Sequence, residues 1–138
     1  MNKIQTLIYA ALPMICMATA ATAVTPDTQN FSSSDIPRIV EVSRANEMRF
    51  NRDYRGGAFI GVMPLARIHE RMFSEGTYMV EFGSGGFGGN VDCDVSDKST
   101  IDRLTDWTAG QMIGVKGVIR TTILGDLELE DCTYESTP

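Results

Sequence analysis

Residues 111–132 of the chain, QMIGVKGVIRTTILGDLELEDC, consist of two apolar segments on either side of a turn at Leu124-Gly125-Asp126. Apolar side chains alternate with polar ones along both segments: Ile113, Val115 and Ile119 in the first, Leu127 and Leu129 in the second. This period predicts a half-buried β-hairpin. Gly114 and Gly117 indicate sharp bending of the first strand, as a small barrel requires.

The residues before this hairpin supply the other pieces of a barrel. A helix is expected over 37–51, because Ser34-Asp35 is a helix-start signal and Gly56 a stop. Strands are expected over 58–68, with a bulge or edge at Pro64, and over 77–82 and 90–95. A short helix should begin at Ser99. This order predicts a mainly-β fold, a five-stranded OB-fold barrel with an N-terminal helix and a short helix between strands 3 and 4.

The first 23 residues have the form of a secretory signal peptide. Lys3 gives a positive start, a short apolar run follows, and Ala21-Thr22-Ala23 is a cleavage site of small residues. The alternative is an uncleaved membrane anchor. Residues 24–34 are polar and aperiodic, so we expect a flexible lead-in, followed by the OB-fold domain over 35–138. Cleavage predicts a periplasmic or secreted protein without a membrane span.

The charge of the chain disfavours a polyphosphate ligand. Once the signal peptide with Lys3 is removed, 11 basic residues face 18 acidic ones. A net charge of −7 repels nucleic acid unless a local basic patch intervenes.

Two cysteines, Cys93 and Cys132, remain in the mature chain, since Cys16 leaves with the signal peptide. In an oxidising compartment such a pair predicts one disulfide, and the alternative is two buried thiols. Cys132 has the parity of the polar Glu128 and Glu130. Either a bulge near Asp131 turns it inward, or the bridge lies on the outer face.

Several short motifs together carry a family resemblance. They are Asn46-Glu47 with Arg52-Asp53-Tyr54-Arg55-Gly56, Val91-Asp92-Cys93, Gly110-Gln111 with Val115-Lys116-Gly117-Val118, and Leu127-Glu128-Leu129-Glu130-Asp131-Cys132. The chain resembles, over residues 40–135, the bacterial exported tRNA-anti-like group of OB-fold proteins. The resemblance implies the OB-fold and brings no catalytic residues, and the family's name does not imply tRNA binding here.

No motif predicts catalysis or a cofactor. The glycine-rich residues 83–88 have the spelling of a dinucleotide loop, but a strand follows them instead of the helix that would hold a pyrophosphate. His69 is the single histidine and has no serine or cysteine paired with it in a recognisable motif. We therefore expect no enzyme activity, no catalytic residue, no cofactor and no metal ligand.

Two acidic clusters leave a cation-binding envelope protein open as an alternative. Asp92, Asp94 and Asp97 form the first, and residues 126–131 the second, without the spacing of an EF-hand. As strand residues, Asp92 and Asp94 are expected to point outward as ordinary solvated side chains.

The most suggestive surface is the connection after the first barrel strand. In an OB-fold this loop and the loop between strands 4 and 5 flank the ligand face. The predicted ligand-binding residues are Arg67, His69, Arg71 and Phe73, with Phe87 in the glycine-rich connection. In the alternative, Ile68, Met72 or Phe73 anchors a solvated loop in the barrel end.

The sequence therefore predicts a non-catalytic exported binding module. Its expected ligand is a protein or oligosaccharide of the cell envelope, and single-stranded nucleic acid is the less favoured alternative, by analogy with the fold.

Overall fold

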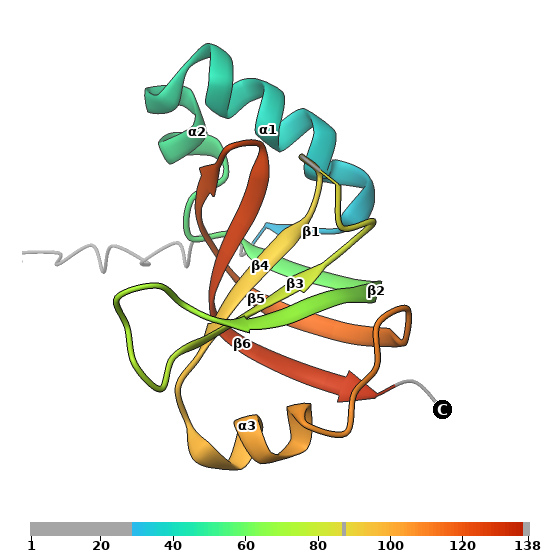
Figure 1. Ribbon diagram of the computed structural model, residues 1–138. Helices are drawn as coiled ribbons and strands as arrows, with labels where there is room; N and C mark the ends of the chain where they lie inside the picture. Colours follow the sequence, from blue (N-terminus) through green and yellow to red (C-terminus); the bar gives the residue numbers. More distant parts are fainter. Residues whose placement is uncertain (1–28, 87, 137–138) are drawn as a thin grey trace, which may run out of the picture.

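The computed structural model describes residues 29–86 and 88–136, so the predicted signal peptide and Phe87 lie outside the described residues. Five strands form a closed barrel: β2 (Ala58–Glu70), β3 (Tyr78–Phe82), β4 (Val91–Val95), β5 (Met112–Ile123) and β6 (Asp126–Ser136). Their order is β2-β3-β4-β6-β5, and antiparallel pairing of β2 with β5 closes the barrel (Figure 1). The predicted OB-fold is confirmed.

The β5–β6 hairpin has the predicted turn. Leu124 and Gly125 connect the strands with φ angles of 53° and 97°, the left-handed region that a tight two-residue turn uses. The alternating apolar residues of both strands point into the barrel and are almost fully buried: Ile113, Val115, Ile119, Leu127 and Leu129.

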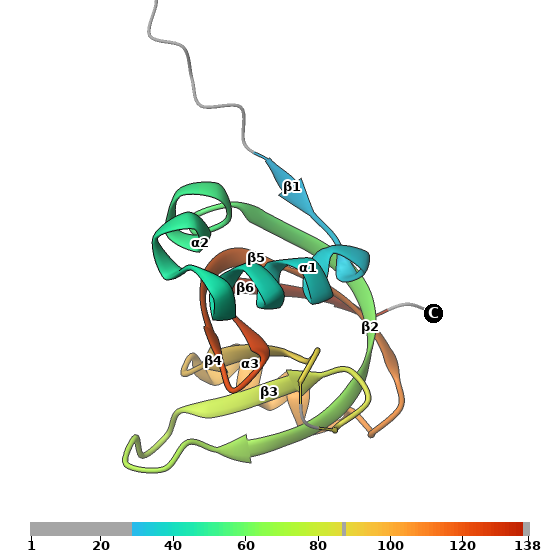
Figure 2. The same cartoon turned by 90° about the horizontal axis from the view of Figure 1, so that it is seen from above.

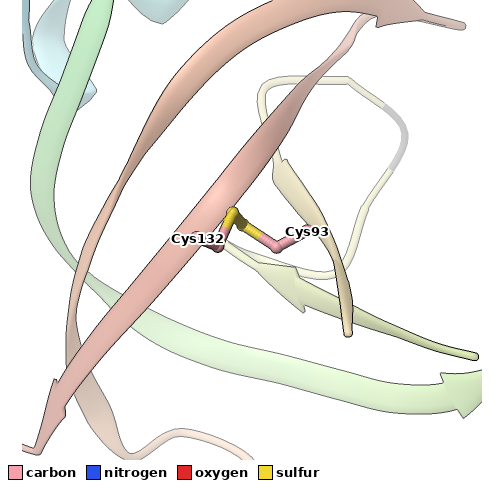
Figure 3. Close-up of a disulfide and its surroundings, with 2 residues drawn as sticks. All are labelled: Cys93 and Cys132. Carbon is pink, nitrogen blue, oxygen red and sulfur yellow. A yellow bond between two sulfur atoms is a disulfide. The ribbon is translucent and has the colours of Figure 1, made fainter. Parts of the chain in front are cut away.

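The disulfide between Cys93 and Cys132 is confirmed, with a Cα–Cα distance of 6.2 Å (Figure 3). Residues 131 and 132 of β6 lie opposite Gly117 alone, because the pairing of β5 with β6 shifts between Lys116 and Val118. Asp131 has a φ of 53° at this bulge. The bulge therefore turns Cys132 against the core, the first of the two expected arrangements.

The predicted N-terminal helix is confirmed, but it does not run unbroken over 37–51, because the chain forms two helices here, α1 (Ile36–Ala45) and α2 (Glu47–Asp53). Asn46 ends α1 in an extended conformation, and its side-chain oxygen accepts a hydrogen bond from Arg49 N at 3.0 Å. Asparagine is a poor residue inside a helix and a good N-cap, which is why the helix divides at this residue. Helix α1 covers one end of the barrel with Ile36, Ile39 and Val40 (Figures 1 and 2).

Residues 29–34, which the sequence predicts to be part of a flexible lead-in, are ordered against the barrel. Strand β1 (Asn30–Phe31) pairs in parallel with the start of β2, and a 3₁₀ turn, η1 (Ser33–Asp35), leads into α1. Phe31 is buried with its ring 5.3 Å from that of Tyr54. Burial of this one aromatic side chain fixes a segment whose other residues are polar.

Helix α3 (Lys98–Leu104) covers the other end of the barrel (Figure 1). It begins one residue earlier than predicted, because the carboxylate of Asp97 is the N-cap and accepts from Thr100 N at 2.8 Å. Trp107, in the connection to β5, packs edge-on against Tyr134. Within the described residues, none of the helices has the length and apolar character needed to cross a bilayer.

Candidate ligand-binding surface

The connection between β2 and β3, residues 71–77, is a folded loop. Arg71 N donates to Thr77 O at 2.8 Å, and Ser74 N donates to Arg71 O at 3.2 Å. Gly76 N donates to the carboxylate of Glu70 at 3.0 Å. These bonds fix the base and the returning arm of the loop.

Two large apolar side chains lie at the tip of this loop and are exposed. Met72 is 79% exposed and Phe73 fully exposed. Phe73 also has a φ of 67°, a left-handed conformation that is unfavourable for a bulky residue. The alternative that Met72 or Phe73 anchors the loop in the barrel is therefore wrong, whereas Ile68 does pack against the core.

Arg71 joins the loop to the outer face of the barrel. Its guanidinium donates to the carboxylate of Asp94 on β4 and to that of Glu128 on β6, the latter at 3.3 and 3.4 Å. Arg120 Nη1 lies 3.8 Å from the same Glu128 carboxylate. Nearby, Arg67 Nε donates to Glu81 on β3 at 2.6 Å. We call the outward side chains of β3, β4 and β6 that carry these carboxylates the acidic face.

Carboxylates on the acidic face are more buried than their outward parity predicts. Glu81 and Glu128 are 4% and 3% exposed. Asp92 and Asp94 are half-buried, and each has one carboxylate oxygen that is shielded from solvent and has no hydrogen-bond partner within the described residues. The expectation that Asp92 and Asp94 are ordinary solvated residues is therefore wrong, because neighbouring strands and arginines cover them.

Asp92 is the electrostatic centre of this face. Burial, together with the negative charges of Asp126, Glu81 and Glu128, raises its pKa to about 7, while Arg67 opposes the shift. At neutral pH the Asp92 carboxyl is therefore partly protonated. A surface of this kind repels phosphate groups and attracts cationic ones.

The predicted ligand-binding residues are distributed over two elements. Arg67 and His69 both belong to β2, which extends to Glu70, two residues beyond the predicted strand, so neither lies in the connection that follows it. Arg71 and Phe73 do lie in the loop. Arg67 and Arg71 both reach the acidic face, whereas the exposed side chain of His69 makes no hydrogen bond or ion pair within the described part of the chain.

The described residues of the glycine-rich connection, 83–86 and 88–89, are held against the β5–β6 turn. Asn90 is buried and connects the two: its N–H donates to Asp126 at 3.0 Å, and its side-chain amide donates to Gly86 O at 2.5 Å. Strand β4 follows directly, so no helix N-terminus is present here for a pyrophosphate. Phe87 lies outside the described residues, and its predicted role is not tested.

The acidic clusters do not converge on a metal site. Between residues 29 and 136, Phe87 excepted, no three His, Cys, Asp or Glu side chains are placed so that they could hold a metal ion. Asp97 caps α3, and the carboxylates of Asp94 and Glu128 are bound to Arg71.

Sequence reasoning missed the buried carboxylates Glu81 and Glu128. Both glutamates lie beside arginines of neighbouring elements. These neighbours can be identified only when the strand register is known. It also missed an apolar cleft beside β2, because the residues that line it come from three separate segments.

A scan against protein-family models gives no match, and no curated protein is similar in sequence. Solved structures are similar in fold. A provisionally assigned nucleic acid-binding lipoprotein from Klebsiella pneumoniae superposes with a TM-score of 0.55 at 11% identity, over 79% of this chain and 92% of that one. A provisionally assigned aspartyl-tRNA synthetase from Leishmania major gives a TM-score of 0.49 at 10% identity, and this chain covers 24% of its length.

At such low identity these likenesses show the OB-fold alone. Membership of the exported tRNA-anti-like group stays a prediction.

Proposed function

We propose that the chain is an exported, non-catalytic OB-fold module that binds a protein or oligosaccharide of the cell envelope. The binding surface is the 71–77 loop together with the adjoining acidic face, which includes the outer side of β3 and β4. In OB-folds this part of the barrel is the usual ligand surface.

The exposure of Phe73 carries the proposal. Its ring is fully exposed on a loop that four hydrogen bonds and the ion pairs of Arg71 hold in place. The unfavourable φ of 67° costs about 1 kcal/mol and gives no packing in return. Strain without a structural benefit is typical of a residue that is kept for an intermolecular contact.

Site-specific photo-crosslinking in the producing cells tests this surface. A photoreactive phenylalanine analogue at position 73 should form defined adducts with an envelope component. The same analogue at position 48 is the control, because Met48 is 83% exposed on α2, away from the loop. Equal adduct patterns at the two positions would contradict the proposal.

Export can be tested separately. The mass of the protein recovered from the periplasmic or culture fraction should correspond to cleavage after Ala23. An uncleaved chain in the cytoplasmic fraction would remove the envelope from the proposal and leave the binding surface to be judged by crosslinking.

Single-stranded nucleic acid is the alternative ligand, and the carboxylates around Arg67 and Arg71 disfavour it. Fluorescence anisotropy with a labelled oligonucleotide should give no saturable binding at physiological salt. Salt-dependent binding that Arg67→Glu and Phe73→Ser both weaken would favour the nucleic-acid alternative instead. Arg67 suits this test better than Arg71, because its side chain is 67% exposed and, among the described residues, pairs with Glu81 alone, whereas that of Arg71 is 30% exposed and pairs with both Asp94 and Glu128.

A further inference from the structure

The second half of β2 has an edge to which no described strand is paired. Strand β5 leaves β2 at the pair Pro64 and Met112. The backbone of Leu65 still exchanges hydrogen bonds with Gly110 and Gln111, at 2.7 and 2.8 Å. A bulge lies between Leu65 and Arg67. Beyond it, no described strand pairs with this edge along residues 66–70, while the opposite edge of β2 pairs with β3.

The hydrogen-bond alternation identifies the groups on this edge. Arg71 N donates to Thr77 O across the β2–β3 pair, so the backbone groups of residues 69 and 67 also face β3. Those of Ile68 and Glu70 must then face the other way. No described residue forms a backbone hydrogen bond with them on that side.

An apolar cleft of about 450 Å³ lies beside this edge, between β2 and the connection that leads from α3 to β5. Figure 1 shows β2 crossing the molecule above α3. Leu65 and Leu104 are buried in the cleft, and its partly exposed lining includes Ile68, Tyr78, Ile101 and Trp107. The cleft is thus an opening at the barrel end that α3 does not fill.

The charges around the cleft favour a basic partner. Glu70, at the end of the edge, and Asp106, next to Trp107, are both exposed. Arg67 lines the cleft but is bound to Glu81, which leaves Arg103 on α3 as the other nearby cation. The acidic face and the net charge of −6 for the whole sequence add to the attraction for cations.

We propose that this edge and cleft bind an extended peptide segment of a partner protein by strand addition. The segment forms main-chain hydrogen bonds with Ile68 and Glu70, places one aliphatic or aromatic side chain in the cleft, and carries Lys or Arg beside that side chain. An open strand edge supplies main-chain affinity, and an adjacent apolar pocket supplies selectivity for the inserted side chain. The inference goes beyond the proposed function and does not depend on the tip of the 71–77 loop.

The experiment begins with short random peptides displayed on phage and selected against the purified chain. Selected peptides are synthesised, and their affinity is measured from the fluorescence of Trp107, which is the single tryptophan of the sequence and lines the cleft. We expect basic and apolar residues in the selected sequences. Replacing their Lys or Arg with Glu should weaken binding about tenfold, which corresponds to 1.4 kcal/mol.

Two variants of Glu70 form a matched pair. Glu70→Ala removes the carboxylate and keeps the N–H group, whereas Glu70→Pro removes both. Proline is tolerated on an edge strand where its nitrogen faces away from the ladder. Glu70→Pro should bind the selected peptides at least about tenfold more weakly than Glu70→Ala. Equal affinity of the two variants would overturn strand addition.

A cleft variant and amide exchange complete the test if Glu70→Pro fails to fold. Ala109→Phe places a ring in the cleft and should abolish binding, while Ala45→Phe on α1, at the other barrel end, should leave it unchanged. Peptide binding should slow hydrogen exchange at the amides of Ile68 and Glu70.

Phe73→Ser should change the peptide affinity by no more than about twofold, so the proposal for this edge and the proposal for the 71–77 loop can be refuted independently. A selection without binders, or protection confined to the 71–77 loop, would overturn the inference.

Discussion

The inner face of β3, β4 and β6 is shielded from solvent, and so are two carboxylates on their outer face, but the chemistry differs. The inner face is almost entirely apolar and nearly inaccessible, with Val80, Phe82, Val91, Cys93, Leu127 and Leu129. On the outer face, Glu81 and Glu128 are nearly as buried and depend on arginines for compensation. Burial of the apolar inner face stabilises the fold. Burial of the carboxylates costs free energy, and apolar or solvated side chains at the same positions would avoid this cost. The outer face is therefore the part of the barrel where a binding role best accounts for the residues present.

The largest expected effect is on the inner face, where the disulfide closes a long loop. Cys93→Ser combined with Cys132→Ser should reduce the free energy of unfolding by about 4 kcal/mol, because the sequence separation is 39 residues. Urea unfolding of the oxidised protein, the reduced protein and the double variant measures this loss. Reduction should mimic the double variant. Equal midpoints with and without reductant would mean that the inner face does not depend on the bridge.

The second expected effect is on the outer face. Arg71→Met leaves the carboxylates of Asp94 and Glu128 without their closest counter-charge and should destabilise the fold by roughly 2 kcal/mol. Adding Glu128→Gln should recover part of this loss, since a neutral amide has less need of the guanidinium. Arg38→Met, an exposed residue of α1, is the control and should change stability by less than about 0.5 kcal/mol. Equal losses in the two single variants would remove the contrast between the faces.

The inner face could be predicted from the sequence, because it depends on local patterns. Alternation places Ile113, Val115 and Leu127 inside, and the parity conflict at Cys132 indicates a bulge near Asp131. Each of these signals is contained within a few consecutive residues. The division of the N-terminal helix at Asn46 is also local, but an apolar stripe that continues past it conceals the cap.

The outer face could not be predicted, because it depends on register. Whether Glu81 and Glu128 are solvated or buried depends on which arginines face them from β2, β5 and the loop. Arg71 lies 57 residues from Glu128 in the chain. The length of β2 was underestimated for a similar reason: pairing with β3 extends the strand through His69 and Glu70, which have no strong strand preference alone.

The third expected effect has the opposite sign and depends on pH. The pKa of Asp92 is raised from 3.8 to about 7 in the folded protein, so between these values the folded chain holds a proton that the unfolded chain has lost. The contribution of Asp92 to stability therefore falls as the pH rises through this window and is lowest above pH 7. Asp92→Asn should match the wild type near pH 4 and exceed it by about 1 kcal/mol at pH 8, a figure reduced for partial solvent screening.

Urea unfolding at several pH values between 4 and 8 measures the effect of Asp92→Asn. Glu41→Gln, which removes an exposed carboxylate on α1, should leave the pH profile of the wild type unchanged. A profile of Asp92→Asn that runs parallel to the wild type would show that the acidic face is solvated like any other surface.

The smallest expected effect concerns the loop that borders the acidic face. Phe73→Gly should raise the free energy of unfolding by about 0.5 kcal/mol, because the relief of strain at a φ of 67° slightly exceeds the added entropy of the unfolded chain. Met72→Gly is the matched control, because Met72 is also largely exposed but lacks the positive φ, so the variant should lower stability by about 0.5 kcal/mol. Thermal unfolding measures the stability of both variants, and binding of the component that crosslinks to position 73 measures their function.

A variant at Phe73 that is more stable and no longer binds would show that the loop retains its strain for contact with a ligand. If Phe73→Gly loses stability instead, the ring supports the fold, and the contrast between a stabilising interior and a binding exterior no longer extends to this loop.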